Sequence, residues 1–345
     1  MPTEDALLAL AGLSTGDAFG QSLFIPDAIE YIRRRELPTP PWRWTDDTQI
    51  SLSVVEELRY RGWIDQDALA RRLAWRYSTD PVRGYGGQTH QIMERIAHGE
   101  YFRSVTRSVK DGGSYGSAAS ARAAPLGAYF SGNPGRASRE ARLAAGITHA
   151  HLEGLAGAQA VAVAAALISE KTALKGSDLL LEVLKYIPDG EVSRRIAAVS
   201  EIPPSGYQDA VRHFRAGPDH STMTTVPFSL WVATNYADNF AEALWRTVAA
   251  LGVRDTTCAI VGSLVALSSR HIAEEWILRR EPLPRGFERV PAGRGTSRFN
   301  GSPACPARAD AGRFRPSSDP RRRVDALAQP VGNAWMAGRY FPAWS

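Results

Sequence analysis

The chain has 345 residues, 44% of them hydrophobic, which is enough to bury a large core. Its two cysteines, Cys258 and Cys305, exclude a disulfide framework. We see no apolar run long enough to span a bilayer and no basic and apolar leader, so we expect neither membrane insertion nor secretion, and a cytoplasmic location. The net charge of +5 does not indicate a nucleic-acid-binding domain, because residues 285–345 hold 11 Arg against 4 acidic residues, whereas residues 1–284 hold 30 basic and 32 acidic residues.

The first informative element is a pair of carboxylates at the start of a predicted helix. The tetrad Trp44-Thr45-Asp46-Asp47 precedes Thr48 and a run of apolar residues at helical spacing, which places both acids in the first turn. There the positive end of the helix dipole favours negative charge. A cluster of oxygen ligands suits a hard divalent cation such as magnesium, but Thr and Asp are also ordinary helix caps, and from the tetrad alone both interpretations remain open.

Two stretches rich in small residues follow. Their candidate substrate-binding residues are Gly84, Tyr85, Gly86, Tyr115, Gly116, Ser117, Ala118 and Ala119. Small residues let a ligand approach the backbone, so the second stretch is a candidate for binding phosphate through its N–H groups. Small-residue turns are also common without a ligand, the two tyrosines are either stacking platforms or loop anchors, and Arg122 is either an ion-pair residue or a support for the loop.

The apolar spacing in the rest of the chain up to residue 283 is overwhelmingly helical. We expect helices over residues 65–75, 136–145, 156–168, 178–186, 193–199, 226–235, 240–251 and 256–269. The Ala- and Val-rich stretch 156–168 is predicted to lie inside a bundle. Because no strand pattern and no solenoid period is visible, the sequence predicts a single compact all-α domain over residues 1–284.

Two histidines precede the most apolar helix. His149 and His151 are spaced by one residue, and Glu153 follows closely. They are candidates for a metal site or a polar pocket, but this spacing does not indicate zinc without further ligands nearby, and an isolated His in a helical domain is usually a structural group.

A second set of oxygen donors lies at the start of the last long helix, in Arg254-Asp255-Thr256-Thr257. If this helix start faces the one at residue 46, the oxygens of Thr45, Asp46, Asp47, Asp255 and Thr256 can close a binuclear metal site. Metal ions there would grip vicinal hydroxyls of a sugar and supply an acidified water for cleavage of a glycosidic bond. The meeting of the two sets is a prediction about tertiary structure.

Residues 285–345 form a tail of different composition. They are rich in Arg, Pro, Gly and Ser, and lack apolar periodicity until a short aromatic end. Such a composition predicts a disordered segment. We favour a solvated extension without a ligand. The alternative is that the basic tail binds nucleic acid or an acidic partner.

Seven motifs occur in one order along the chain. They are Leu13–Gly20, Trp44–Asp47, Arg83–Gly87, Gly113–Ala119, Arg122–Gly127, Ile147–His151 and Leu251–Thr257. This ordered set, from about residue 6 to about residue 283, resembles the ADP-ribosylglycohydrolase family, the relatives of the dinitrogenase-reductase-activating glycohydrolase. The resemblance implies an orthogonal all-α bundle and a magnesium-dependent hydrolase that removes ADP-ribose from a modified protein side chain or a small molecule.

The same resemblance implies roles for individual residues. Two magnesium ions would be bound by Thr45, Asp46, Asp47, Asp255 and Thr256. Asp255 would bridge both ions, and Asp46, Asp47 and Asp255 would be the catalytic residues. The stretch 84–86 would form the rim of the site, the stretch 116–119 would receive the diphosphate, and His149 would border the nucleotide.

The chain departs from the family pattern at three functional parts. Val253 stands where relatives carry a further Asp ligand, which predicts weaker binding of one ion. Gln21 and Phe24 occupy a stretch where relatives often have a Glu suited to act as general base. The phosphate loop reads Ser-Ala-Ala-Ser over residues 117–120 instead of Asn-Gly-Ala-Ala. These changes keep a second hypothesis open, a degenerate ADP-ribose-binding or scaffold protein, while a metal phosphohydrolase is disfavoured because clustered His-Asp pairs are absent.

Overall fold

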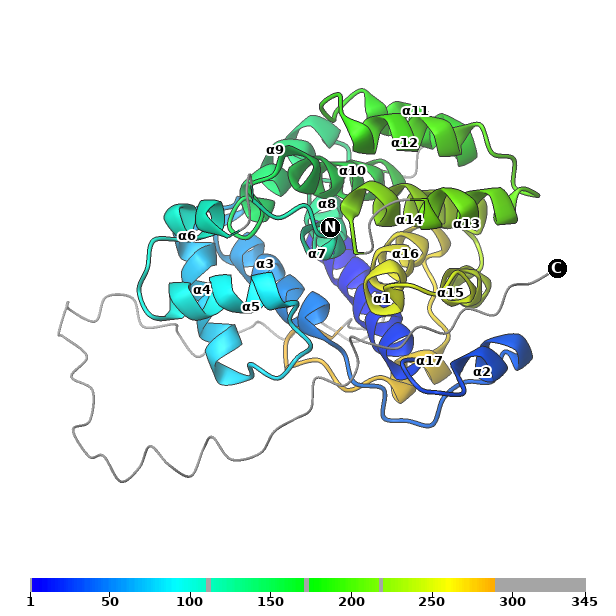
Figure 1. Ribbon diagram of the computed structural model, residues 1–345, viewed down its shortest axis with the longest axis horizontal. Coiled ribbons are helices and arrows are strands. Elements are labelled where there is room, and N and C mark those ends of the chain that lie inside the picture. Colours follow the sequence, from blue (N-terminus) through cyan, green and yellow to red (C-terminus); the bar gives the residue numbers. More distant parts are fainter. Residues whose placement is uncertain (1, 110–112, 171–173, 217–219, 289–345) are drawn as a thin grey trace. The chain divides into compact units, whose positions relative to one another are not determined.

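The computed structural model describes residues 2–109, 113–170, 174–216 and 220–288, and within these ranges the chain forms helices and no strand (Figure 1). The helices are α1 (Pro2–Ser22), α2 (Ala28–Arg34), α3 (Asp46–Arg61), α4 (Gln66–Thr79), α5 (Gly87–Ala97), α6 (Phe102–Ser108), α7 (Ala118–Ala121), α8 (Ala123–Tyr129), α9 (Pro134–Ala145), α10 (Leu152–Ser169), α11 (Gly176–Leu184), α12 (Glu191–Ser200), α13 (Tyr207–Arg215), α14 (Thr222–Asn235), α15 (Phe240–Ala249), α16 (Arg254–Ser269) and α17 (Glu274–Arg279). The predicted all-α fold is confirmed.

The predicted helices are all present, and their ends differ from the predictions by a few residues. The largest differences are four residues, at the end of α4, at the start of α10 and at the start of α14, which begins at Thr222 rather than at residue 226. Its start is set by Ser221, whose hydroxyl accepts a hydrogen bond from the N–H of Met223 at 3.1 Å. Apolar periodicity reports the buried face of a helix, whereas a cap such as this one decides where the helix begins.

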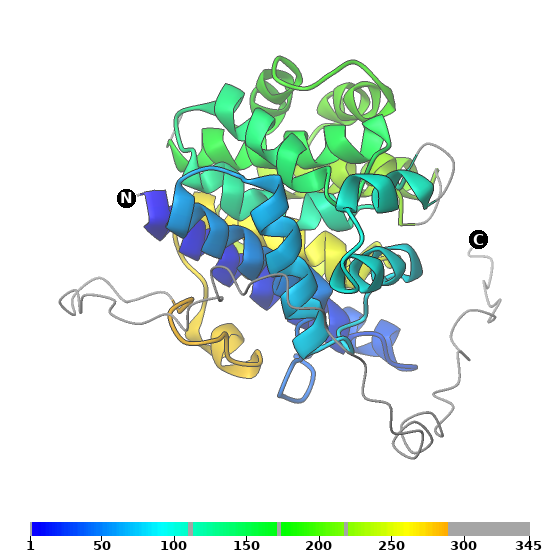
Figure 2. The ribbon, with the colours of Figure 1, turned by 90° about the vertical axis from the view of Figure 1, so that its left-hand side faces the viewer.

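The closest helix pair is α1 and α16, which pack antiparallel along their length (Figures 1 and 2). Three glycines spaced four apart, Gly12, Gly16 and Gly20, line the contact. A Cβ atom on Gly12 would lie 2.2 Å from the carbonyl oxygen of Gly262, and one on Gly16 would lie 2.0 Å from that of Cys258. The two backbones therefore touch directly, and this contact brings residues 17–20 of α1 against the start of α16.

Helix α10 is the most apolar helix, and it lies inside the bundle against α8, α9 and α14. By length and composition alone it qualifies as a membrane span, with 18 residues, a mean hydropathy of 1.6 and 83% of them buried. Our expectation that no apolar run reaches that length is therefore wrong. Burial explains the composition, because a helix surrounded by other helices is apolar on all sides.

The segment before α3 is held by the end of the described chain. The N–H of Trp42 donates to the carbonyl of Arg279, and the N–H of Glu281 donates to the carbonyl of Trp42, both at 2.7 Å. Farther on, Leu283 and Phe287 are buried in a small cluster completed by Leu10, Leu52 and Val55. The packed chain thus continues three residues beyond the domain end placed at 284, and the predicted tail from residue 289 onward lies outside the described residues.

Candidate functional site

The start of α3 buries both of its predicted site carboxylates. Asp46 and Asp47 are 7% and 3% exposed. Thr45 is the N-cap, and its hydroxyl oxygen accepts from the N–H of Asp47 at 3.3 Å. The capping interpretation of this tetrad is therefore correct for Thr45, while the two acids, which cap nothing, point to a further role.

Asp17 of α1 fixes the position of this helix start. Its carboxylate accepts four hydrogen bonds, from the N–H and hydroxyl of Thr45 at 2.9 and 2.8 Å and from the N–H and hydroxyl of Thr48 at 3.2 and 2.5 Å. Asp17 is fully buried. It stands in the motif Leu13–Gly20 but was not among the predicted site residues; the signal that identifies it is a single carboxylate within the largely apolar stretch 6–20.

The start of α16 meets the start of α3. The hydroxyl of Thr256 hydrogen-bonds to the carboxylate of Asp47. The adjacent Asp255 is partly exposed, and it accepts from the N–H of Thr256 at 2.8 Å. The two distant acid sets are thus brought together.

The four carboxylates are electrostatically coupled. Burial raises the pKa of Asp46 well above its ordinary value, and the negative charges of Asp255 and Asp17 raise it further. The pKa of Asp47 is raised by burial and by the same neighbours together with Asp46. Burial, opposed by hydrogen bonds from Thr48 and Thr45, raises the pKa of Asp17 to about 7. Like charges in a buried site repel, so this cluster is suited to an added positive charge.

The donor set fits a hard dication by its chemistry. Carboxylate and hydroxyl oxygens are the protein ligands that magnesium prefers. In the part of the chain that the structure describes, no three His, Cys, Asp or Glu side chains are already arranged as a metal cage. Thr45 also has a competing structural role, because its hydroxyl donates to Asp17. The five predicted ligands therefore remain a prediction.

The departures from the family pattern lie beside this cluster. Val253 is 5% exposed, belongs to the main hydrophobic core and occupies the N-cap position of α16 without any side-chain cap. Phe24 lies beneath the guanidinium of Arg254, whose central carbon is 4.3 Å from the ring centroid. A hydrocarbon thus stands two residues before Asp255, and an aromatic ring contacts its neighbour Arg254.

The loop at residues 83–86 lies against the start of α3. The carbonyl of Arg83 accepts from the N–H of Asp46 at 2.7 Å, and a Cβ atom on Gly84 would be 3.9 Å from Cβ of Thr45. The Arg83 guanidinium lies 3.6 Å from the ring centroid of Trp44 and pairs with Glu281. The predicted rim residues therefore adjoin the acid cluster.

Tyr85, predicted as a stacking platform or an anchor, is held in the loop. Its hydroxyl donates to Oε1 of Gln49 at 2.5 Å, and its ring meets that of Tyr77 edge-on. These contacts are those of an anchor. Gly86 precedes α5 as its N-cap.

The second predicted loop, residues 115–119, meets the start of α14. The N–H of Ser117 donates to the carbonyl of His220 at 3.0 Å, and the N–H of Gly116 donates to Oγ of Ser114 at 3.2 Å. Both of these amides, expected to be available to phosphate, already have partners. Ala118 and Ala119 come next, in the first turn of α7, where backbone N–H groups lack intrahelical acceptors.

His220 is a second residue that the sequence analysis missed. It is exposed, has a left-handed backbone with φ of 58°, and lies near Asp255. Burial raises the pKa of Asp255, and the N–H of Thr256 and the His220 imidazole partly offset this effect. No motif in the sequence marks His220, because its place beside Asp255 results from the packing of α14 and α16.

The two histidines singled out in the sequence have different roles. His149 is buried, its Nδ1 is 2.7 Å from the hydroxyl of Thr148, and it hydrogen-bonds to the backbone of Gly116 in the second loop. His151 caps α10 through Nδ1, which accepts from the N–H of Glu153 at 3.1 Å, and its ring meets that of Tyr115. His149 thus bonds to the backbone of the second loop, whereas His151 caps a helix and contacts that loop through the ring of Tyr115.

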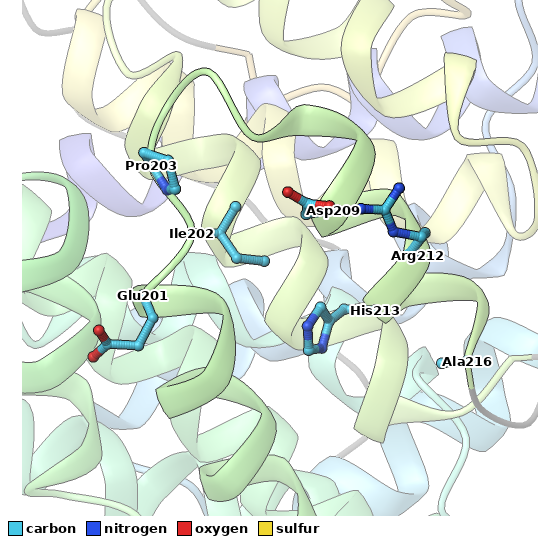
Figure 3. Close-up of a pocket in the computed structure, with 7 residues that line it drawn as sticks. All are labelled: Glu201, Ile202, Pro203, Asp209, Arg212, His213 and Ala216. Atoms are coloured by element: carbon cyan, nitrogen blue, oxygen red, sulfur yellow. Dashed lines mark ion pairs between the residues drawn. The ribbon is translucent and has the colours of Figure 1, made fainter.

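A separate groove of about 510 Å³ lies between the end of α12 and α13 (Figure 3). It is lined by Glu201, Ile202, Pro203, Asp209, Arg212, His213 and Ala216. Asp209 and Arg212 form an ion pair with each other. None of these residues belongs to the acid cluster or its loops, so the groove is not part of the candidate site.

Comparison with known proteins gives the family. A sequence model of ADP-ribosylglycohydrolase matches residues 2–291. The chain belongs to the ADP-ribosylglycohydrolase family. The family resemblance inferred from the ordered motifs is confirmed, and the all-α ADP-ribosylglycohydrolase fold agrees with it.

Several individual proteins are similar. ADP-ribosylhydrolase ARH3 of Xenopus tropicalis is 29% identical over 222 residues, which cover 60% of this chain and 63% of that protein. ADP-ribosylhydrolase ARH3 of Homo sapiens is 30% identical over 153 residues, 43% of this chain and 41% of that protein. The matches thus span less than two thirds of these relatives. A solved structure described as an ADP-ribosylglycohydrolase-related protein complex superposes with a TM-score of 0.60 at 25% identity, over 81% of this chain and 93% of that chain.

Proposed function

We propose that this ADP-ribosylglycohydrolase family member is a magnesium-dependent hydrolase that removes ADP-ribose from a modified protein side chain or a small molecule. The observation that carries the proposal is the meeting of Asp46 and Asp47 with Asp255 in one electrostatically coupled cluster. The relatives named for ADP-ribose hydrolysis support the same reaction.

The proposed ligands of two magnesium ions are Thr45, Asp46, Asp47, Asp255 and Thr256. Bound magnesium supplies orientation of the ribose hydroxyls and a more acidic water. Asp17 holds the first three ligands in place through its bonds to Thr45 and Thr48. The loop at 83–86 closes one side of the cluster, and the start of α7 is left to receive the diphosphate.

A second candidate function is a weak or inactive ADP-ribose-binding or scaffold protein. Val253 favours it, because a buried hydrocarbon replaces a charged ligand beside Asp255. The occupied amides of Gly116 and Ser117 favour it as well, since they leave fewer donors for a phosphate.

The deciding experiment incubates the full chain with ADP-ribosylated arginine and serine peptides in millimolar magnesium and measures free ADP-ribose. We expect release from at least one peptide and its loss on addition of EDTA. In Asp46→Asn and Asp255→Asn variants, release should fall at least about tenfold, since each loses a charged oxygen ligand.

The matched control is Asp67→Asn, which neutralises an exposed carboxylate in the first turn of another helix, α4. It should leave release unchanged. Binding of free ADP-ribose without release from either peptide would favour the second candidate function. Release that persists in EDTA would contradict the role of magnesium.

A further inference from the structure

A continuous hydrogen-bonded chain connects the neighbourhood of the acid cluster to the second loop. Arg122, between α7 and α8, is 1% exposed. Its Nη2 donates to the hydroxyl of Thr148 at 2.6 Å and to the carbonyl of Ala144 at 3.0 Å. The Thr148 hydroxyl in turn lies 2.7 Å from Nδ1 of His149, and His149 bonds to the backbone of Gly116. We call Arg122, Thr148, His149 and Gly116 the relay.

The chemistry of its members fixes the direction of the relay. A guanidinium only donates, so the oxygen of Thr148 accepts from Arg122 and its own hydrogen is free to donate. Nδ1 of His149 at 2.7 Å is a closer acceptor than the carbonyl of Ala145 at 3.4 Å. Nδ1 therefore accepts, and the proton of the neutral imidazole resides on Nε2.

The far end of the relay holds one peptide unit of the loop. The N–H of Gly116 is taken by Ser114, so the group that remains for Nε2–H of His149 is the carbonyl of Gly116. The N–H of the same peptide unit, contributed by Ser117, donates to the carbonyl of His220. The plane of this peptide is thus fixed from both sides.

The near end of the relay faces the acid cluster. The positive charge of Arg122 interacts with the carboxylates of Asp47 and Asp46. Its Nε and Nη1 are buried without a hydrogen-bond partner among the described residues. One side chain therefore acts on both parts of the site, through charge on one side and through hydrogen bonds on the other.

We propose that Arg122 and Thr148 are positioning residues, which hold the loop at residues 114–117 in the conformation that accepts the nucleoside-diphosphate part of the substrate next to the acid cluster. This role rests on the proposed function. Neither residue needs to touch the substrate, because each acts through His149 and Gly116.

The test replaces Thr148 by Val, which keeps its shape and removes the hydroxyl in the middle of the relay. The control is Thr106→Val. Thr106 is 1% exposed, and its hydroxyl donates to the carbonyl of Ile147 at 2.5 Å, outside the relay. Thr148→Ser keeps a hydroxyl and serves as the rescue variant.

The first measurement is amide hydrogen exchange over residues 113–117 in the full chain without ligand. We expect faster exchange in Thr148→Val than in wild type, Thr106→Val or Thr148→Ser. The second is calorimetry with free ADP-ribose and, separately, with magnesium alone. We expect Thr148→Val to weaken ADP-ribose binding about tenfold, the effect of one broken buried hydrogen bond, and to leave magnesium affinity within about twofold.

Equal amide exchange over residues 113–117 in Thr148→Val and Thr106→Val would overturn the relay. The positioning role would also be overturned if the loop of Thr148→Val exchanges faster but the protein binds ADP-ribose with unchanged affinity. If wild type fails to bind ADP-ribose, the proposed function fails, while the exchange experiment still decides the relay. If Thr148→Val does not fold, the nitrogen chemical shifts of His149 in the wild-type protein test the relay instead. They show which ring nitrogen carries the proton, and a proton on Nδ1 would contradict a hydrogen bond donated by Thr148 to Nδ1.

Discussion

At the scale of single residues, the acid cluster combines two unfavourable effects, burial and like charge. Asp17 is partly compensated by its four hydrogen bonds, whereas Asp46 and Asp47 have fewer partners. A protein keeps such a cluster when another charge compensates it, and Arg122 supplies one positive charge. The remaining excess of negative charge is the physical basis for expecting a bound dication.

The pKa shifts predict how stability depends on pH. The pKa of Asp17 is raised to about 7, and those of Asp46, Asp47 and Asp255 are raised as well. A carboxyl whose pKa is raised by folding stabilises the folded state at low pH, and this stability is lost as the pH rises through the folded value. Burial lowers the pKa of His149 from 6.5 to about 3. Its neutral imidazole therefore stabilises the folded state more and more as the pH rises, and this contribution is complete above about pH 6.5, the pKa of a free histidine.

We therefore expect the melting temperature of the protein in EDTA to fall as the pH rises from about 6.5 through the pKa of Asp17 in the folded protein, which is about 7. Millimolar magnesium should remove most of the fall, because it binds the ionised form. Differential scanning fluorimetry measures both. A melting temperature in EDTA that rises over this range would contradict the raised pKa of Asp17.

Val253 allows a second test at this scale. Val253→Asp would place a carboxylate beside Asp255, so we expect magnesium to bind roughly tenfold tighter or more. Without magnesium the variant should be less stable than wild type, because one more charge is buried. Calorimetry and melting with and without magnesium measure these effects, and Val253→Asn, which adds no charge, is the control. Equal magnesium affinity of wild type and Val253→Asp would show that Val253 is not the cause of weak magnesium binding.

At the scale of elements, the contact of α1 with α16 sets the site. Glycines at 12, 16 and 20 let the two backbones touch, and this brings Asp17 of α1 and Asp255 of α16 into one cluster. Helix α3 then joins through the bonds of Thr45 and Thr48 to Asp17. The three helix segments that carry acids are thus fixed by backbone approach and by one buried carboxylate.

Gly12→Ala tests this contact. The added Cβ would lie 2.2 Å from the carbonyl oxygen of Gly262 and 2.5 Å from Cβ of Ala266, so the helices must move apart. We expect a loss of about 1–3 kcal/mol in the free energy of unfolding. Urea denaturation measures it.

The matched control is Gly135→Ala in α9, where an added Cβ meets nothing within 4 Å. There the substitution should be neutral or stabilise by up to about 1 kcal/mol. A Gly12→Ala variant as stable as Gly135→Ala would show that the contact of α1 with α16 is looser than described.

At the scale of the whole molecule, the boundary between the packed domain and the tail can be tested by truncation. Deletion after residue 290 should leave the helical circular-dichroism signal and the melting point unchanged, since the described packing ends before it. Deletion after residue 282 removes Leu283 and Phe287, which are 4% and 9% exposed. It should cost about 3 kcal/mol or more, at 1.5–3 kcal/mol per buried side chain. A drop in melting point on deletion after 290 would place part of the fold in the tail.

The sequence by itself determined most of the longer helices, their approximate ends, the buried place of α10 and the family, but it did not indicate helices such as α5 and α13. These follow from local spacing and from motifs, because amphipathic periodicity, caps and small-residue turns are each contained within a few neighbouring residues. The acids of α3 and α16 were also visible as separate sets. Their side chains could be named, but not the distance between them.

Only the tertiary structure decided which groups share the site. Asp17 and His220 join it through the contact of α1 with α16 and through the start of α14, and no local pattern contains those distances. The amides of Gly116 and Ser117 were predicted to be free, but packing gave them partners in Ser114 and His220. Hydrogen bonds between distant segments depend on the global arrangement of the helices, which is why the sequence alone did not reveal them.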